Sequence, residues 1–344
     1  MIIAVDILSG EKPADVLIRG AIDATKEKDI SVILIGNSAI IEEKLKKFVY
    51  NKKKVEVVHT DEFIGMDEIP TKAIKEKPRS SVIIAAELVK SGKADAFVSP
   101  GNTGASLTAA YIKFGRLKGV SRPAILAHIP KGKDSFTALL DVGANIESKP
   151  INLVQFAVMG EVYAETVWGI KKPKIGLLSN GSEESKGTEI TRKSYKILKR
   201  LPLNFVGYIE GRDIFTENVD VAVCDGFVGN ILLKGIEGIG KLIFSFFKEE
   251  IRKYPFSQLG ALLMSGTFKT IRKKVDYAEY GGAPLIGLNK PCIISHGSAS
   301  SKEIYNAIKV AARIVNYKLN KNIVARLREY DVTKFNWFNW ERFF

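Results

Sequence analysis

Cysteine is scarce in this chain of 344 residues, which contains only Cys224 and Cys292. Two cysteines cannot form a disulfide framework or a zinc cluster, so a reducing compartment is the simplest expectation. The N-terminal segment lacks the basic start and the long apolar stretch of a signal peptide. Nor does any segment contain the roughly 18 uninterrupted apolar residues that a membrane span needs. These absences predict a cytoplasmic protein.

Several catalytic signatures are also missing. The sequence has no G-x-x-x-x-G-K-[ST] run and no G-x-G-x-x-G that opens the first helix, which argues against a P-loop NTPase and a dinucleotide-binding site. The G-x-S-x-G elbow of many hydrolases is absent. No carboxylates, histidines or cysteines cluster with the spacing of metal ligands, so we expect neither a metal nor a cofactor.

Acidic residues are fewer than basic ones, with 38 Asp and Glu against 52 Lys and Arg, and the formal net charge is +14. Such an excess attracts acidic partners such as phosphates, anionic lipid or an acidic protein. A lysine-rich surface adapted to heat is an alternative explanation, and the two are compatible. The basic residues are dispersed rather than arranged in a stripe with interleaved aromatics, so we do not expect nucleic acid as a partner.

The hydrophobic residues, 46% of the chain, occur in strand-like runs that alternate with helical periodicity. Several runs are continuously apolar, as in buried parallel strands. This alternation predicts an α/β fold with a doubly wound, largely parallel sheet. The predicted strands are Ile2–Val5, Ser31–Ile35, Val55–Val58, Ala96–Val98, Ala124–His128, Phe136–Asp141, Lys174–Leu178, Asn204–Tyr208, Val219–Cys224 and Pro291–Ser295. The predicted helices are Ala14–Thr25, Ala39–Phe48, Ser80–Lys90, Asn152–Trp168, Thr188–Leu198 and Lys302–Tyr317.

One segment interrupts the alternation between Asn230 and about Val275. Apolar residues recur there at helical spacing, Pro255 ends the helix, and a second apolar stretch follows. This pattern predicts a helical hairpin that projects from the sheet. Because no repeat or linker is visible, we expect residues 1–317 to form one catalytic unit. Residues 318–344 are then a basic, aromatic C-terminal tail, which is packed, interfacial or disordered, with packing the first choice.

Glycine and small polar residues follow four of the predicted strands. Because the carboxyl ends of parallel strands meet at one edge of a sheet, we expect these loops to gather there around a ligand. Together they are rich in N–H and O–H donors and poor in nucleophiles, which suits a reaction whose nucleophile arrives with the substrate. The four loops are Ser99–Ser106, Ser179–Thr188, Asp225–Asn230 and His296–Ser301.

The loop after the strand Ala96–Val98 is a candidate anion site. Its sequence is Ser99-Pro100-Gly101-Asn102-Thr103-Gly104, and an apolar helix follows. Two glycines let the backbone approach a ligand closely, and a helix N-terminus offers free N–H groups and a partial positive charge. On its own, the same turn is compatible with a plain connection in which threonine caps the helix.

Seven motifs occur in the order found in one known family. From Met1 to about Val315 the chain resembles the PlsX-type phosphate acyltransferases of bacterial phospholipid synthesis. Seven ordered motifs are far more specific than any single glycine turn. The motifs are Ser99–Gly104, Leu140–Asn145, Gln155–Gly160, Glu210–Asp213, Cys224–Asn230, Tyr280–Leu285 and His296–Ser298.

The resemblance implies transfer of a long-chain acyl group from acyl-[acyl-carrier protein] to inorganic phosphate. The acyl phosphate would then serve a downstream glycerol-3-phosphate acyltransferase. The resemblance also implies a fold of the isopropylmalate-dehydrogenase and phosphotransacetylase type, a homodimer, and peripheral binding to the anionic inner face of the cell membrane. The family's active-site lysine and asparagine fall on Lys186 and Asn230.

Phosphate at neutral pH needs positioning more than deprotonation, and negative charge grows on the thioester carbonyl that it attacks. We expect Lys186 to neutralise charge on the phosphate or the oxyanion, and Asn230 to donate a hydrogen bond to one of them. His296 either protonates the departing thiolate or has a capping or packing role. Asp225 either orients Lys186 or caps the following helix. The predicted phosphate- and substrate-binding residues are Ser99, Gly101, Asn102, Thr103, Gly104, Asp225, Gly226 and Asp6.

The chain departs from the family pattern in its first loop and beside the candidate anion site. It has Asp6-Ile7-Leu8-Ser9-Gly10-Glu11 where the family has Asp-Ala-Met-Gly-Gly-Asp, and Pro100 replaces an alanine. These differences put the role of the first loop in question.

At the hairpin tip, apolar residues flanked by basic ones predict contact with an anionic membrane, although core or dimer packing is the alternative. The predicted membrane-contacting residues are Leu259, Leu262, Leu263, Met264 and Phe268.

Two other enzyme classes remain as rivals. A phosphotransacetylase that uses acetyl-CoA has the same fold type, and the apolar hairpin argues for a lipid-delivering enzyme instead. An NAD-dependent decarboxylating dehydrogenase would need carboxylate metal ligands and a substrate-binding arginine cluster, neither of which is found in the sequence.

Overall fold

The computed structural model describes residues 1–132, 135–275 and 281–332. In this part of the chain eleven strands form one sheet in the order β3-β2-β1-β4-β11-β10-β5-β6-β9-β7-β8. All ten predicted strands are present, and their ends agree within two residues. The strands are β1 (Ile2–Asp6), β2 (Ser31–Gly36), β3 (Val55–His59), β4 (Ala96–Ser99), β5 (Ala124–Pro130), β6 (Phe136–Leu140), β7 (Ile175–Leu178), β8 (Phe205–Ile209), β9 (Val221–Val223), β10 (Ala283–Ile286) and β11 (Cys292–Ile294).

Strand direction changes in the middle of the sheet. Strands β1, β2, β3, β4 and β11 are parallel to one another, as are β6, β7, β8 and β9. Between these two sets, β10 is antiparallel to both of its neighbours, and β5 is antiparallel to β6. The two parallel sets therefore run in opposite directions.

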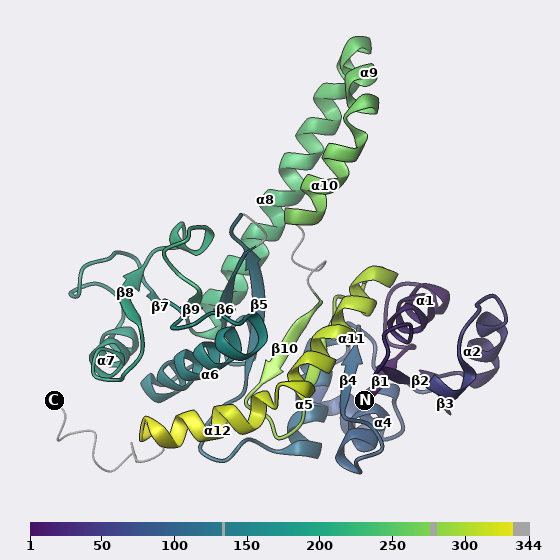
Figure 1. The fold of residues 1–344 in the computed structure, drawn as a ribbon, viewed down its shortest axis with the longest axis horizontal. Helices are drawn as coiled ribbons and strands as arrows, with labels where there is room; N and C mark the ends of the chain where they lie inside the picture. Colours follow the sequence, from purple (N-terminus) through teal and green to yellow (C-terminus); the bar gives the residue numbers. More distant parts are fainter. Residues whose placement is uncertain (133–134, 276–280, 333–344) are drawn as a thin grey trace.

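Helices cover both faces of the sheet, as expected for a doubly wound fold (Figure 1). They are α1 (Ala14–Ala24), α2 (Ser38–Leu45), α3 (Pro70–Glu76), α4 (Ser81–Lys90), α5 (Thr103–Phe114), α6 (Pro150–Trp168), α7 (Glu189–Leu198), α8 (Gly226–Lys253), α9 (Pro255–Leu263), α10 (Ser265–Val275), α11 (Ser301–Asn316) and α12 (Leu319–Glu329). Side chains alternate between the faces of each strand, so Ile3 and Val5 join one apolar core and Ala4 the other. The first core includes α1, α2, α6, α7, α11 and α12, and the second includes α3, α4, α5 and the start of α8.

The predicted helical hairpin is present and projects well beyond the sheet (Figure 1). Its long helix α8 begins at Gly226, four residues before the predicted start. Helices α9 and α10 form the returning arm, and the rings of Phe247 and Phe268 lie 6.2 Å apart between the arms. Phe268 is therefore half-buried within the hairpin, whereas Leu263 at the tip is 80% exposed. Leu259, Leu262 and Met264 are exposed as well. Within the described ranges no helix is long and apolar enough to cross a membrane.

Helix α3, strand β10 and helix α12 have no counterpart in the predicted pattern. Strand β10 is only four residues long and contains Pro284, so it carries little strand signal. Helix α12 lies in the predicted tail, where Leu319, Ile323 and Leu327 are buried at helical spacing. Arg326 binds the carboxylates of Glu161 and Glu165 on α6 at 2.6 and 2.8 Å. The start of the tail is thus packed on the core. The aromatic end, 335–344, lies outside the described residues.

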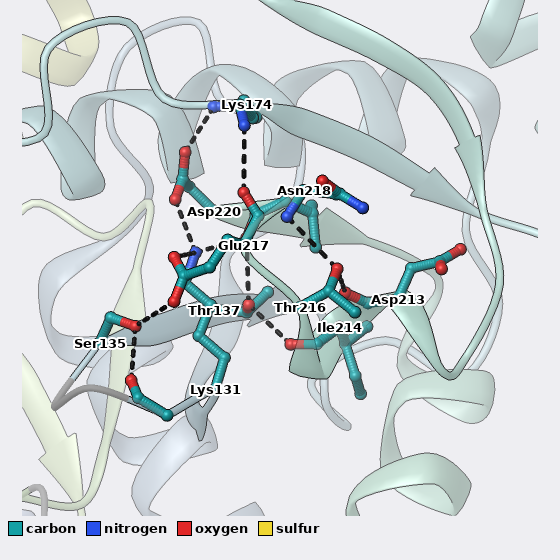
Figure 2. A network of polar contacts seen from close by, with 12 residues as sticks. Lys131, Ser135, Thr137, Lys174, Asp213, Ile214, Thr216, Glu217, Asn218 and Asp220 are labelled. Atoms are coloured by element: carbon teal, nitrogen blue, oxygen red, sulfur yellow. Dashed lines mark hydrogen bonds and ion pairs between the residues drawn. The ribbon is translucent and has the colours of Figure 1, made fainter.

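A polar network closes the turn between β5 and β6 onto β9 (Figure 2). Lys131 is buried, and its ammonium lies 2.7 Å from both the carbonyl oxygen of Val219 and the carboxylate of Asp220. Asp220 also accepts a hydrogen bond from the backbone N–H of Lys174 at 2.8 Å. These contacts satisfy a buried charge and fix the amino end of β9. The carboxyl end of β9 carries part of the candidate site.

Candidate active site

The loops that carry the predicted site fall into two groups. The expectation that they all leave one edge of a parallel sheet is wrong, because the two sets of parallel strands run in opposite directions. The first loop group follows the neighbouring strands β1, β4 and β11 and comprises residues 7–11, 99–104 and 295–300. The second loop group follows the neighbouring strands β6, β9 and β7 and comprises residues 141–145, 224–230 and 179–188.

A sheet of ordinary twist rotates the second loop group relative to the first. Strands β4 and β9 are separated by five strand-to-strand steps. Each step rotates the strand by roughly 20–25°, so the accumulated rotation is about 100–125°. A reversed strand rotated by that amount points its carboxyl end at about 55–80° to that of β4, rather than directly away from it. No hydrogen bond between described residues joins the two groups.

Buried side chains hold the first loop group together. Asp6 ends β1 and Ser99 ends β4, and both are fully buried. The Asp6 carboxylate accepts hydrogen bonds from the backbone N–H groups of Leu8 and Ser9, and from the Ser99 hydroxyl at 2.9 Å. The Ser99 oxygen accepts the N–H of Gly101 at 3.2 Å. These two predicted phosphate-binding side chains therefore have protein partners, which order the loops.

Asn102 is the N-cap of α5, so the cap is the asparagine rather than the threonine. Its Oδ1 accepts the N–H of Ala105 at 3.0 Å, and its Nδ2 lies 2.9–3.3 Å from carbonyl oxygens of the loop 65–68. The side-chain amide is thus occupied within the protein. The N–H groups of Thr103 and Gly104, in the first turn of the helix, have no acceptor in the described part of the chain. These two groups are the free anion donors of the loop.

The departures from the family pattern each make a contact in this group. The hydroxyl oxygens of Ser9 and Ser81 lie 3.0 Å apart. The N–H of Glu11 donates to a carbonyl oxygen of the loop after β11 at 2.8 Å. Pro100 packs beside Gly10, where a Cβ atom would lie 3.2 Å from the proline Cγ. Ser9 therefore ties its loop to α4, while Glu11 and Pro100 contact neighbouring loops of the group.

His296 is the second residue of the loop after β11 and is exposed. Its Nδ1 accepts the backbone N–H of Ser298 at 3.1 Å and lies 2.8 Å from that residue's hydroxyl oxygen. An Nδ1 that accepts a backbone N–H assigns the proton of the neutral ring to Nε2. The ring thus caps its own turn, and Nε2 remains as a donor.

Asp141 is the centre of the second loop group. It follows β6 directly and is fully buried. Its carboxylate accepts hydrogen bonds from the backbone N–H groups of Ile125, Gly143, Ala144 and Asn145, and from the side-chain amide of Asn145, at 2.8–3.2 Å. Burial raises the pKa of Asp141, and these hydrogen bonds oppose that rise. All five neighbouring groups are donors, so the site fits the ionised carboxylate.

The first turn of α8 packs directly on the Asp141 loop. Asp225 is the N-cap, and its Oδ1 accepts a backbone N–H three residues along at 2.9 Å, which confirms the capping role. The N–H of Gly226 donates to the carbonyl of Asn145 at 2.9 Å. A Cβ on Gly226 would lie 2.4 Å from that oxygen, so the close approach requires glycine. Asn230, one turn further, is exposed and lies beside Gly143.

Lys186 lies in the loop after β7 and is exposed. The loop is ordered around it, because Asn180 Oδ1 accepts the N–H of Gly187 at 2.9 Å and the N–H of Lys186 donates to the Glu183 carbonyl at 3.0 Å. The Lys186 ammonium has no ion-pair partner among the residues that the structure describes. Because β7 and β9 are neighbouring parallel strands, this loop and the one that carries Asn230 leave the sheet side by side.

The two cysteines supply no reactive thiol to the site. Cys224 and Cys292 are fully buried, and burial raises the pKa of both thiols well above the usual range. Neither is placed to act as a thiolate nucleophile. Across the described ranges, no three His, Cys, Asp or Glu residues come together in a way that could hold a metal ion.

Comparison with known proteins identifies the family. Residues 1–322 match the family described as "Fatty acid synthesis protein". A phosphate acyltransferase from Leptospira biflexa serovar Patoc is 44% identical over 332 residues, which cover 96% of this chain and 98% of the relative. The phosphate acyltransferase of Pelobacter propionicus is 46% identical over 331 residues, covering 96% and 95%. The chain belongs to this family.

Solved structures share the fold at low sequence identity. A phosphotransacetylase from Streptococcus pyogenes superposes with a TM-score of 0.61 at 19% identity, covering 93% of this chain and 94% of the other. A branched-chain phosphotransacylase from Enterococcus faecalis gives a TM-score of 0.57 at 15% identity, covering 92% and 99%. The predicted fold type, a largely parallel α/β sheet like that of the phosphotransacetylases, is therefore confirmed.

The sequence patterns predict no role for Asp141 or Ser81. The sequence signal for Asp141 is an acidic residue directly after a buried strand, with Gly143 two positions further on. Ser81 carries no local signal, because its contact with Ser9 joins residues 72 positions apart.

Proposed function

We propose that this family member transfers a long-chain acyl group from acyl-[acyl-carrier protein] to inorganic phosphate, and so makes an acyl phosphate. The observation that carries the proposal is the placement of Lys186 and Asn230. The segments that contain them follow two neighbouring parallel strands, β7 and β9. Both side chains are exposed and have no side-chain partner in the described ranges. The names of the curated relatives support the acyl transfer to phosphate. The acyl-carrier donor comes from the family resemblance.

In the proposed reaction, a phosphate oxygen attacks the thioester carbonyl carbon and forms a tetrahedral oxyanion. The intermediate collapses when the carbon–sulfur bond breaks, which yields the acyl phosphate and the carrier thiolate. Lys186 neutralises charge on the phosphate or the oxyanion, and Asn230 donates a hydrogen bond to one of them. Removal of a single preorganised donor of this kind raises the activation free energy by about 2.7–4 kcal/mol.

The first loop group contributes to phosphate binding through its backbone. The N–H groups of Thr103 and Gly104 and the N-terminus of α5 supply donors and a partial positive charge. Asp6, Ser99 and Asn102 act indirectly, because their side chains hold the loops in place. The Nε2–H of His296 is offered as a hydrogen-bond donor to the departing thiolate, and only the doubly protonated ring could transfer a proton to it; a thiol of pKa near 8.5 leaves without much assistance.

The fold likeness to phosphotransacetylases makes acetyl-CoA a second candidate acyl donor. A single assay separates the two donors. The enzyme is supplied with phosphate and either long-chain acyl-carrier protein or acetyl-CoA, and the acyl phosphate is trapped with hydroxylamine as a hydroxamate. We expect phosphate-dependent hydroxamate from the carrier substrate. Product from acetyl-CoA alone would favour the second candidate, and no product above the phosphate-free control from either donor contradicts acyl transfer.

The hairpin supports two further proposals, a homodimer and a peripheral contact with an anionic membrane surface. Apolar side chains on α8 are exposed along one length of the helix, including Ile239, Leu242 and Phe246, which is typical of a helix-to-helix interface. At the tip the exposed Leu263 is available for lipid. We place the protein in the cytoplasm, where its product would pass to a glycerol-3-phosphate acyltransferase at the membrane.

Vesicle co-sedimentation tests the membrane contact. Leu263→Glu is expected to release the protein from vesicles that contain anionic lipid, because burial of a charge replaces burial of a leucine. Val49→Glu is the matched control, since Val49 is 99% exposed and lies outside the hairpin. Equal vesicle binding by both variants and the unaltered protein would contradict the proposed membrane contact of the hairpin tip.

A further inference from the structure

The buried carboxylate of Asp141 has no contact with solvent and no place in the proposed reaction. It nevertheless binds the whole loop that follows β6. Four backbone N–H groups and one side-chain amide converge on its two oxygens. Because the N–H groups of 143–145 point inward to Asp141, this loop cannot itself bind an anion with them.

Two chains of contact run from Asp141 to the first turns of α8. In the first, the carboxylate accepts the N–H of Gly143 at 3.2 Å, and Asn230 lies directly against that glycine. Gly143 has a φ of +134°, and a Cβ there would lie 3.7 Å from the Asn230 Cβ. In the second, the carboxylate binds Asn145, whose carbonyl oxygen accepts the N–H of Gly226 at 2.9 Å.

The backbone of Asp141 also contacts the same region. Its N–H donates to the carbonyl of Cys224 at 3.0 Å, and a Cβ on Gly229 would lie only 1.9 Å from its carbonyl oxygen. The helix therefore sits on the Asp141 loop with almost no clearance. Displacement of the loop must displace the start of α8, because packed interiors transmit small shifts.

We propose that Asp141 is a positioning residue, which acts on the reaction by holding the start of α8 so that Asn230 faces the substrate. This inference rests on the proposed function of Asn230. Asp141 touches no reacting atom. Its effect on turnover passes through Asn230, and it disappears when Asn230 is removed.

The test is a double-mutant cycle with Asp141→Asn and Asn230→Ala. An asparagine at 141 keeps the shape but directs an N–H₂ group at N–H donors, which loosens the loop. Alone, Asp141→Asn is expected to lower kcat by about 10- to 100-fold, as misplacement of a reacting group does. In the Asn230→Ala background the same change is expected to lower kcat by less than about threefold. Equal factors in both backgrounds overturn the proposal, as does an unchanged kcat for Asp141→Asn.

Asp220→Asn is the matched control, since this carboxylate binds Lys131 and the Lys174 N–H at the other end of β9. It is expected to lower the thermal midpoint while leaving kcat unchanged. Gly143→Ala perturbs the same contact with Asn230. It replaces Asp141→Asn in the double-mutant cycle if the Asp141→Asn variant does not fold. A Gly143→Ala variant whose kcat effect is additive with Asn230→Ala contradicts the proposal equally.

Hydrogen–deuterium exchange gives a readout that does not depend on the reaction. Asp141→Asn is expected to speed exchange at the amides of 143–145 and in the first turn of α8, 226–230, whereas Asp220→Asn leaves both unchanged. Unchanged exchange in the first turn of α8 overturns the inference even in an active enzyme. Faster exchange there in a protein that makes no acyl phosphate contradicts the proposed function but leaves the structural link intact.

Discussion

The two loop groups are built from similar residues but use them differently. In the first group, the polar side chains of Asp6, Ser99 and Asn102 bind other parts of the protein, and backbone N–H groups of the α5 N-terminus remain for an anion. In the second group, Asp141 occupies the inward-facing donors, while Lys186 and Asn230 are exposed and have no side-chain partner in the described ranges. Polar residues in a glycine-rich loop are therefore of two kinds. Some hold the loop in place through hydrogen bonds within the protein, and others are exposed on the ordered loop, where they can contact a ligand.

This difference separates stability from activity. Removal of a partnered, buried group leaves its former partners unsatisfied, which lowers the free energy of unfolding. Removal of an exposed group without a partner costs little stability, so its effect is confined to the reaction. Substitutions of Lys186 and Asp6 test whether the two groups differ in this way, and His128 applies the same reasoning to a buried residue outside them.

The largest effect is expected for Lys186→Ala. We expect kcat for acyl transfer to fall about 100-fold or more, because the charge that the lysine neutralises develops in the transition state. The thermal midpoint is expected to stay within about a degree of that of the unaltered protein, since the side chain is exposed. Steady-state kinetics and thermal unfolding measure the two quantities.

Lys171→Ala is the control, because Lys171 is also exposed and belongs to neither loop group. It is expected to change neither quantity. Near-normal turnover of Lys186→Ala would remove Lys186 from the mechanism.

The next effect is expected for Asp6→Ala in the first loop group. The substitution leaves the N–H groups of Leu8 and Ser9 and the Ser99 hydroxyl without their acceptor in a buried site. We expect the free energy of unfolding to fall by about 2 kcal/mol, measured by urea denaturation.

Ser80→Ala provides the comparison for Asp6→Ala. The Ser80 hydroxyl is also buried but has no hydrogen-bond partner in the described ranges, so its removal is expected to change stability by less than about 0.5 kcal/mol. Equal losses for the two variants would show that the Asp6 contacts contribute nothing particular.

The smallest effect is expected for His128, whose ring has one nitrogen with a hydrogen-bond partner and one without. Its Nε2 lies 2.8 Å from the Tyr163 hydroxyl, whereas its Nδ1 is buried without a partner in the described part of the chain. Burial lowers the pKa of His128 to about 4. The folded state keeps the ring neutral while the unfolded chain takes up a proton near pH 6.5, so stability is full above pH 6.5 and falls as the pH drops toward 4.

From these pKa values the loss between pH 6.5 and pH 5 is about 1.5 kcal/mol. Denaturation series at both pH values measure it, and His128→Leu is expected to lose this part of the pH dependence. A slope that is the same with leucine at 128 would assign the acid sensitivity to other groups.

Much of the fold could be predicted from local patterns. Ten strands were predictable because their apolar runs are continuous or flanked by turn residues. Strand β10 escaped prediction because its four residues form a strand only through pairing with β5 and β11, which lie far away in the sequence. Helix α12 carries apolar residues at helical spacing, but its place on α6 depends on the long-range pairing of Arg326 with Glu161.

The candidate site was predictable in its residue types and only partly in its arrangement. Glycine turns after strands located the loops, and Lys186 and Asn230 followed from the family motifs. The division into two loop groups was not predictable, because no local feature of β5 or β6 indicates that the two strands pair antiparallel. Asp141 lies within one of the family motifs, but its contact with β5 and the packing of its loop on α8 appear only in the folded chain. Ser81 contacts a residue distant in sequence, so no motif indicates its role.

The sequence by itself determined the α/β class, the projecting hairpin and the positions of the glycine-rich loops, because periodicity and turn chemistry are local properties of a chain. Tertiary structure alone decided which polar side chains are hydrogen-bonded within the protein and which remain exposed to a ligand. Asp6 and Asp141 are bound by donors from other strands, and Lys186 is not. A hydrogen-bond partner is set by distance in space, and for a buried group that partner determines whether it orders the protein or meets a ligand.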